Sequence, residues 1–381
     1  MSTTFRNALC SLLLVFLAGC ARSPLLRPLP PPLILAPLTR IAPHSPVAWH
    51  PDEERVSLVR GALFDYDLAS GRERLLSAGK PLALAWSPDG LRLAAADRDL
   101  ETTRLTLLSE NGTLLAEASV PGIIDCLLWD GDDSILAIAV TIQIYSFGGN
   151  LSATLVRWDG EGSPSATLLY ETSLKPLTLR TWGERLYSLP QLALSPWGDE
   201  LLFARLHDPP AFNPYLKIVV RHRQSGAERV VASVALTSAG AGYLGDGERI
   251  LYGDGSRRTL DAPPWGGETA FEYPWGGRAL AASPGGRYRL VDGHLLDQEK
   301  EIAIFSGVER AVFSPSGDRL LLAKDGRLWV LGGLGADPLP GFDPALEERL
   351  RRLRSWRARG LITDGDYREQ KARMVEETSR H

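Results

Sequence analysis

Short apolar segments alternate with polar turns along most of this chain. One pattern recurs, an apolar run, a turn rich in Ser, Pro, Asp and Gly, and a second apolar run. It is clearest in LAWSPDGLRLAAA from Leu84 and in AVFSPSGDRLLLA from Ala311. Further copies begin at Val47, Leu127, Leu192, Gly242 and Leu280. Runs of this length predict strands, and the turn residues supply the backbone angles of a tight reversal, so each copy predicts a β-hairpin.

Two more strand-like runs follow several of these hairpins. After the copy at Leu84 they are Arg104–Ser109 and Thr113–Ser119, joined at Asn111-Gly112. Asn-Gly is a strong signal for a two-residue hairpin turn. The equivalent runs are 62–67 and 72–76 in the first copy, and 217–222 and 227–233 in the fourth. Four antiparallel strands repeated roughly every 40 residues predict the blades of an all-β propeller.

The copies predict a seven-bladed β-propeller, with six or eight blades as the alternatives because the spacing is uneven. The segment Ser173–Pro190 lengthens the gap between the third and fourth copies, which indicates an insertion or a long excursion between blades. The last copy has no clear fourth strand, whereas the apolar segment Leu33–Ile41 precedes the first copy without a partner. We therefore predict that Leu33–Ile41 supplies the outer strand of the last blade and closes the ring, which would cover an open sheet edge.

The motif LAWSPDGLRLA resembles the WD40-like (PD40) repeat of TolB-type propellers, over roughly residues 47–331. The copies at Leu127, Gly242 and Leu280 depart from it, since each lacks the Ser-Pro pair or the aromatic residue. The resemblance implies a propeller over residues 33–342. TolB-type propellers dock protein partners in the bacterial cell envelope, so it also implies an envelope protein as partner. The chain lacks the separate N-terminal domain of TolB, which leaves a specific role in the Tol system without support.

The first residues have the composition of an export signal. Arg6 precedes an apolar run from Ala8 to Gly19, which is shorter than the roughly 20 residues of a membrane-spanning helix. A short apolar run behind a positive charge is typical of a secretory signal peptide, here residues 1–19.

Leu17-Ala18-Gly19-Cys20 resembles a bacterial lipobox. That resemblance implies cleavage before Cys20, lipidation of its sulfur and membrane attachment through the lipid. Ala21 in place of Asp implies attachment to the outer membrane, facing the periplasm. Residues 20–32 form a Pro-rich tether, whose last twelve residues would span roughly 37 Å as polyproline II. The alternative is an ordinary secretory signal that ends at a chance cysteine.

The composition changes at Asp343. Asp343 and Pro344 are helix-start residues, and Leu346, Leu350, Leu353 and Trp356 fall on one helical face. A second short helix is predicted after Thr363, so residues 343–381 form a helical hairpin. It resembles the SHOCT motif, which implies homo-oligomer formation through this hairpin. The alternative is that the helices pack on their own propeller.

No arrangement of residues that carries catalysis stands out. There is no G-x-S-x-G elbow, no CxxC, no P-loop and no dinucleotide fingerprint, and the six histidines lack metal-ligand spacing. We therefore expect no catalytic residues, no metal and no cofactor. The acidic run Asp130–Asp133 occupies a hairpin-turn position rather than a calcium loop. Cys126 is the one cysteine in the predicted body, and its apolar neighbours favour a small buried hydrophobe over a nucleophile.

Two Pro-Trp-Gly-Gly copies place Trp265 and Trp275 in predicted loops. Exposed Trp in loops anchors partners or stacks on sugars, so both are candidate partner-binding residues, with turns that cover a blade edge as the alternative. The formal net charge of -4 is too small to predict a nucleic-acid partner. Together these features predict a lipid-anchored periplasmic propeller that binds proteins as a non-catalytic scaffold. The alternatives are a lyase or glycan hydrolase acting on cell-wall polysaccharide, and binding of cell-wall glycan.

Overall fold

The computed structural model describes residues 29–42, 45–131, 133–188, 192–195, 198–210, 213–236, 241–243, 249–253, 259–262, 271–273, 280–337, 370 and 373. The strands of this part form seven four-stranded antiparallel sheets. Sheet 1 contains β2 (Val47–Trp49), β3 (Arg55–Val59), β4 (Leu63–Asp67) and β5 (Glu73–Ser77). Sheet 2 contains β6 (Ala83–Trp86), β7 (Arg92–Asp99), β8 (Thr102–Ser109) and β9 (Leu114–Pro121). Sheet 3 contains β10 (Ile123–Asp130), β11 (Ser134–Tyr145), β12 (Gly148–Trp158) and β13 (Ser165–Leu174).

The other sheets follow in chain order. Sheet 4 contains β14 (Leu192–Leu194), β15 (Glu200–His207), β16 (Tyr215–His222) and β17 (Glu228–Ala235). Sheet 5 contains β18 (Ala241–Tyr243), β19 (Ile250–Gly253), β20 (Thr259–Ala262) and β21 (Phe271–Tyr273). Sheet 6 contains β22 (Leu280–Ala282), β23 (Tyr288–Val291), β24 (His294–Asp297) and β25 (Lys300–Ile304). Sheet 7 contains β26 (Arg310–Phe313), β27 (Leu320–Lys324), β28 (Arg327–Gly332) and β1 (Ile34–Arg40).

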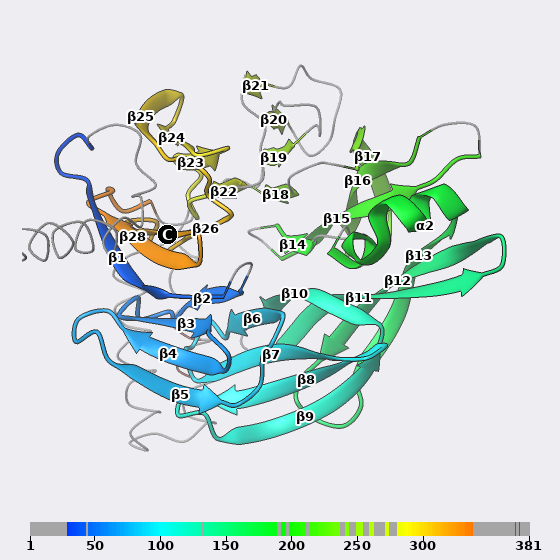
Figure 1. The fold of residues 1–381 in the computed structure, drawn as a ribbon, viewed down its shortest axis with the longest axis horizontal. Helices are drawn as coiled ribbons and strands as arrows, with labels where there is room; N and C mark the ends of the chain where they lie inside the picture. The colour runs from blue at the N-terminus through cyan, green and yellow to red at the C-terminus, as the bar shows by residue number, and fades with distance from the viewer. Residues whose placement is uncertain are drawn as a thin grey trace, which may run out of the picture.

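The sheets are arranged in a ring. Their first strands contact one another in the cyclic order β2, β6, β10, β14, β18, β22, β26 and back to β2. Figure 1 shows these strands on the inside of the ring, with the later strands of each sheet farther out. Sheets that follow one another around a common centre, each with its first strand innermost, define a β-propeller. The predicted all-β propeller class is therefore confirmed.

The apolar core lies between neighbouring sheets. Leu107 of β8, Ile135 of β11 and Trp158 of β12 are all buried and belong to one cluster, although they come from sheets 2 and 3. Sheet stacking buries strands on both faces, which explains the nearly continuous apolar runs in the second strands. The outer strand β9 has most of its side chains exposed. Each sheet is therefore stabilised mainly by the two sheets beside it.

The recurring turn explains why the motif contains Ser, Asp and Gly. Ser87 follows β6, and its hydroxyl donates to Asp89 Oδ1 at 2.6 Å and accepts from the backbone N–H of Arg92 at 2.9 Å. Gly90 has a φ of 71°, an angle that side chains disfavour. The same serine arrangement recurs at Ser195, Ser283 and Ser314. The motif therefore encodes the hairpin that joins the first two strands of a sheet, as the sequence predicted.

The ring is closed by the N-terminal strand. β1 pairs antiparallel with β28, from Ile34 opposite Gly332 to Arg40 opposite Arg327. This confirms the prediction that Leu33–Ile41 supplies the outer strand of the last sheet. Because β1 precedes sheet 1 and completes sheet 7, the seam holds together segments from opposite ends of the propeller sequence and covers the edge of β28.

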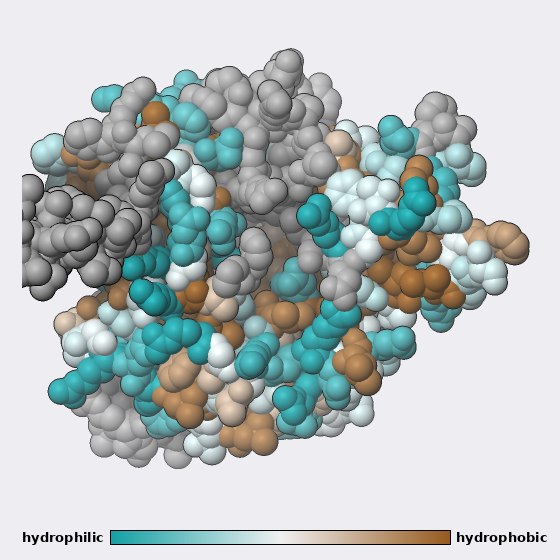
Figure 2. All heavy atoms as spheres, viewed as in Figure 1, coloured by the Kyte–Doolittle hydropathy of each residue, from teal (hydrophilic) through white to brown (hydrophobic). Residues whose placement is uncertain are grey.

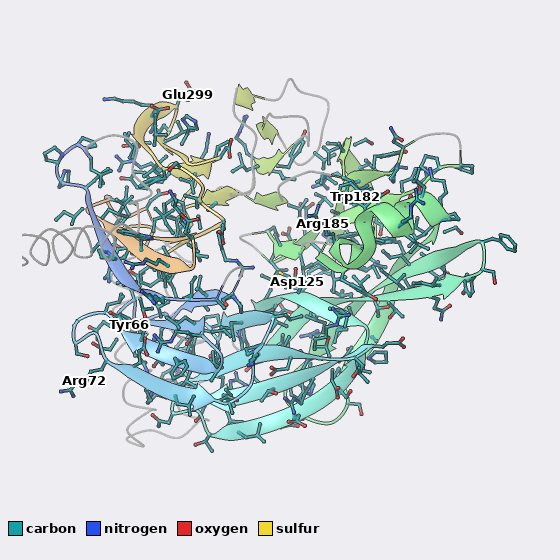
Figure 3. All side chains as sticks on the ribbon, in the orientation of Figure 1. Tyr66, Arg72, Asp125, Trp182, Arg185 and Glu299 are labelled. Carbon is teal, nitrogen blue, oxygen red and sulfur yellow. The ribbon has the colours of Figure 1, made fainter. Side chains whose placement is uncertain are left out.

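The predicted insertion between the third and fourth copies is helical. α2 (Pro176–Trp182) and the 3-10 helix η1 (Gly183–Ser188) follow β13. The segment is held to sheet 4 because the backbone N–H of Lys175 donates to the buried Asp208 at 2.8 Å. Figure 3 marks Trp182 and Arg185 in this segment, on the same side of the ring as the long β11–β12 hairpin. In the part of the chain described above, no helix has the length and apolarity needed to cross a membrane.

Candidate functional site at the channel mouth

A cavity of about 1060 Å³ opens at one end of the central channel. It is lined by the ends of β2, β6, β10, β14, β22 and β26 and by the turns that follow these strands. We call this opening the channel mouth, and the face of the ring that carries these turns the mouth face. Ligand sites in proteins have volumes of about 300–1,000 Å³, so the channel mouth has room for a peptide segment or several side chains.

The aromatic residues of the motif lie at the channel mouth and join neighbouring sheets. The indole N–H of Trp129 donates to the carbonyl of Ala85 in sheet 2 at 2.9 Å. The indole N–H of Trp49 donates to the carbonyl of Val312 in sheet 7 at 3.0 Å. Both indole donors are occupied within the protein, so the rings present apolar surface to the cavity. The motif aromatics therefore stabilise the ring and also contribute apolar surface to its mouth.

The described lining also contains Ser195, Ser283 and Ser314 and one ion pair. Arg223 Nη1 donates to Asp130 Oδ1 at 2.9 Å, and Arg223 Nη2 pairs with Asp130 Oδ2. Asp130 lies at the end of β10 and Arg223 lies after β16, so the pair bridges sheets 3 and 4. Arg223 also donates to the carbonyl of Gly198 at 2.7 Å. Asp130 and Arg223 are the charged residues in the described lining, and their charges cancel.

Carboxylates from other segments complete two turns of the mouth face. Glu53 of sheet 1 accepts hydrogen bonds from the backbone N–H and, at 2.7 Å, from the hydroxyl of Ser316 in sheet 7. Burial raises the pKa of the Glu53 carboxyl and the charge of Asp318 adds to this, whereas the bonds from Ser316 and the charge of Arg319 oppose it. The ring is thus joined at the mouth face as well as at the β1–β28 seam.

Sheet 6 lacks the acidic residue of the motif, because its turn contains Gly285-Gly286 instead. Asp337, which follows the last strand, replaces it. The carboxylate of Asp337 accepts hydrogen bonds from the Ser283 hydroxyl and, at 2.8 Å, from the backbone N–H of Arg287. The chain therefore passes from β28 across the mouth face and contacts sheets 6 and 7 beside the cavity.

The described lining offers no arrangement for general acid and base catalysis. It contains one carboxylate, that of Asp130, and this group is neutralised by Arg223. Glycoside hydrolysis requires two carboxyl groups about 5–10 Å apart across the scissile bond. Within the part of the chain that the structure describes, no group of three or more His, Cys, Asp or Glu could hold a metal ion. The leucine, valine and tryptophan side chains of the channel mouth offer apolar contacts to a ligand beside its polar groups.

The predicted site residues lie outside the described residues. This applies to Cys20, to Trp265 and Trp275, to the signal peptide 1–19, to most of the tether 20–32 and to nearly all of residues 343–381. These assignments remain predictions. The described residues of the acidic run, Asp130, Gly131 and Asp133, lie at the end of β10 and before β11, at a hairpin turn as predicted.

Sequence reasoning missed two features of the site. The first is the ion pair between Asp130 and Arg223, whose members are 93 residues apart. The second is the replacement of a missing turn carboxylate by Asp337. The turn of sheet 6 has no acidic residue, and this absence indicated that a carboxylate from another segment would complete the turn. It does not identify the residue that supplies that carboxylate.

Cys126 is partly buried between sheets 3 and 4. Its thiol donates to the carbonyl of Leu192 at 3.7 Å and packs against the apolar cluster between sheets 3 and 4. Burial raises the pKa of the thiol to about 11, and the negative charge of Asp125 contributes, whereas the bond to Leu192 opposes the shift. Since the thiolate is the reactive species, these contacts favour the structural interpretation of this cysteine.

We expect Cys126 to react with a maleimide at pH 8 about a hundredfold more slowly than an exposed cysteine, because the thiolate is scarce at that pH. The rate is measured on the folded chain with Cys10 and Cys20 replaced by serine. The matched control adds Ser119→Cys on the exposed part of β9 and should react at the ordinary rate. Equal rates at the two positions would contradict the prediction.

The comparison with known proteins shows the fold. The chain is similar to the β-propeller domain of Cps50 (Swd1) from Myceliophteria thermophila, with a TM-score of 0.53 and 14% identity over 78% of this chain and 99% of that domain. It is also similar to the Dos1 propeller, with a TM-score of 0.52 and 11% identity over 80% of this chain and 97% of that one. No protein-family model matches the chain, and no curated protein matches it in sequence. At this level of identity the two likenesses establish that the chain has the β-propeller fold.

Proposed function

We propose that this protein is a lipid-anchored binding or scaffold module of the bacterial cell envelope, in which the seven sheets are the seven blades of one ring. In this proposal the partner is a protein that inserts an apolar segment into the channel mouth. The observation that carries it is the cavity of about 1060 Å³, whose described lining combines apolar and aromatic side chains of the inner strands with three serines and the neutralised pair Asp130–Arg223. Burial of apolar surface is the main source of affinity that such a lining offers.

The point at which the chain enters the propeller supports a role for the mouth face. β1 begins at Ile34, opposite Gly332, and this end of sheet 7 also carries the turn after β26. The chain therefore enters the propeller from the mouth face. With Cys20 lipidated and residues 20–32 as tether, the partner would be held at the membrane surface to which the lipid is attached. Outer-membrane attachment on the periplasmic side remains part of the proposal.

A glycan hydrolase or lyase is the second candidate, and cell-wall glycan is the second candidate ligand. The single, neutralised carboxylate in the described lining favours binding over hydrolysis at the channel mouth. Residues Trp265 and Trp275 stay in the proposal as additional partner contacts.

The test is a crosslinking pull-down from the native envelope with the full-length chain. The site variant is Leu128→Glu, which places an unpaired carboxylate in the lining. The matched control is Leu115→Glu at an exposed position of β9. We expect Leu128→Glu to reduce partner recovery at least tenfold, because a charge buried in an apolar interface is strongly unfavourable, and Leu115→Glu to leave it unchanged. Equal recovery with both variants would exclude the channel mouth as the docking site.

A Cys20→Ala variant tests the anchor separately. If lipidation holds the protein in the membrane, this variant will leave the membrane fraction while its propeller still folds. Retention of Cys20→Ala in the membrane fraction would contradict lipid anchoring at this cysteine and would leave the channel-mouth proposal standing. If the pull-down recovers glycan and no protein, the partner is a cell-wall polymer and the protein-binding proposal is wrong.

A further inference from the structure

The hairpin of β11 and β12 extends beyond the strand that should cover it. β10 pairs with β11 only as far as Ile123 opposite Val140. β11 continues to pair with β12 on its other side until Tyr145 opposite Gly148. Gly122 still lies against Thr141, and beyond that point no described strand pairs with this side of β11. The segment from Ile142 to Tyr145 is therefore an edge strand among the described residues, and we call it the β11 edge. Along such a strand, alternate residues direct their N–H and C=O groups towards the open side.

The β11 edge lacks the residues that normally protect an open strand. No charged residue and no proline occurs between Asp133 and Arg157. Ile144 is 73% exposed, and Phe147, in the turn beside it, is 94% exposed. Protein edges are usually blocked by charges, prolines or bulges, because an open apolar edge is a template for another strand. An edge without such protection is suited to pairing with a further strand.

We propose that the β11 edge pairs with the same edge of a second copy of this chain. Antiparallel pairing centred on Gln143 places each Gln143 opposite its counterpart and Ile142 opposite Ile144 of the other copy. This register is symmetric about a two-fold axis, as an isologous dimer requires. Two identical edges that carried charge near the axis would repel each other, and this edge carries none.

The side chains beside the edge add to the same interface. Gly149 pairs with Ile144, and a Cβ at Gly149 would lie 3.1 Å from Leu179 Cδ1 of α2. Ile144 therefore lies on the sheet face that carries α2, where Leu177 is 62% exposed. A two-fold axis perpendicular to the sheet brings Ile144 and Leu177 of both copies to one face of the joined sheet. Figure 2 shows hydrophobic surface gathered on this side of the molecule.

The β11 edge lies away from the channel mouth. The turn between β11 and β12 lies at the opposite end of sheet 3 from the turn after β10, so the hairpin projects from the face opposite the channel mouth. Figure 1 shows the hairpin on the opposite side of the ring from β1. The pairing is therefore independent of the proposed docking at the channel mouth, and it goes beyond that proposal.

A single cysteine at the symmetry axis provides the first test. In the full chain with Gln143→Cys, the two new cysteines face each other with Cα atoms about 4.5–5.5 Å apart, within the range that a disulfide spans. The matched control is Ser119→Cys, which is likewise exposed but lies on the outer strand β9, in a chain with the same native cysteines. We expect a disulfide-linked dimer with Gln143→Cys on a non-reducing gel and at least tenfold less with Ser119→Cys.

A charge variant provides the second test. Ile144→Lys introduces two like charges close to the axis, and we expect the dimer fraction to fall at least tenfold by light scattering of the full chain in detergent. Ile144 is exposed, so the circular dichroism of the variant should match that of the native chain. A monomeric native chain without a Gln143→Cys crosslink would overturn the proposal. So would a crosslink to a different protein, or a dimer that survives Ile144→Lys and disappears when residues 343–381 are removed.

Discussion

Replacement of Trp86 by alanine is expected to lower the free energy of unfolding by about 4 kcal/mol, the loss typical of a large aromatic side chain removed from a core. Trp86 is buried and lies between sheets 1 and 2. Its indole N–H donates to the Ser57 hydroxyl at 2.9 Å, and its ring meets that of His50 edge-to-face at 4.5 Å. The alanine variant leaves a cavity between two sheets and an unpaired buried hydroxyl.

Urea unfolding of the full chain measures this loss. Trp86→Phe keeps a ring in the core but removes the donor, so it should cost about 1–2 kcal/mol through the unpaired Ser57 hydroxyl. The double variant Trp86→Phe, Ser57→Ala removes donor and acceptor together and should be more stable than Trp86→Phe alone. Leu115→Ala on exposed β9 is the control and should stay within about 0.5 kcal/mol of the native value. A loss below 1 kcal/mol for Trp86→Ala would mean that Trp86 does not join the sheets.

The hairpins and the ring closure were predictable because they depend on local rules. The turn of the motif is encoded by neighbouring residues, as Ser87, Asp89 and Gly90 show. The closing strand was predictable because the last copy had one strand too few and Leu33–Ile41 had no partner. The departures from the motif at Leu127 and Leu280 did not prevent sheet formation, because alternating apolar runs and sheet stacking remain there.

Contacts between sheets could not be predicted in the same way. The partners Asp130 and Arg223, or Glu53 and Ser316, meet only after the ring has closed, and nothing in their local sequence selects one partner over another. The extra length of β11 and β12 is a related case. Its apolar residues were visible, but the place where β10 stops pairing is set by the path of the chain at Gly122. The channel mouth likewise exists only as a product of several sheets.

The contact between sheets 1 and 2 also contains a buried carboxylate, that of Asp65, whose side chain is 3% exposed. Asp65 Oδ2 lies 2.9 Å from Arg74 Nη2 and 3.4 Å from Arg55 Nη1. Its other oxygen, Oδ1, is buried and accepts no hydrogen bond from the described residues. Arg74 is the more solvated of the two cations, at 43% exposure against 21% for Arg55. Arg55 therefore supplies the compensating charge that is better shielded from water.

Arg55→Met is expected to lower the free energy of unfolding by about 2 kcal/mol, because the buried carboxylate of Asp65 loses one of its two counter-charges and keeps Arg74. Combining it with Asp65→Asn should restore part of this loss. The losses of unfolding free energy in the two single variants should then sum to at least 1 kcal/mol more than the loss in the double variant. Arg72→Met is the control, since Arg72 is exposed and Figure 3 shows it at the outer rim. Additive losses in urea unfolding would contradict the pairing.

The Arg55→Met variant should also change how the stability of the protein depends on pH in acid. Burial alone would raise the pKa of Asp52, but the hydrogen bond from His50 and the charges of His50 and Arg55 lower it from 3.8 to about 2. A carboxyl whose folded pKa is lowered stabilises the fold above its unfolded pKa, and this contribution is lost as the pH falls from 3.8 towards 2. Without Arg55 the folded pKa moves back towards 3.8, so Arg55→Met should lose this contribution at a higher pH than the native chain. Acid titrations of both chains that run parallel would show that Arg55 does not act on Asp52.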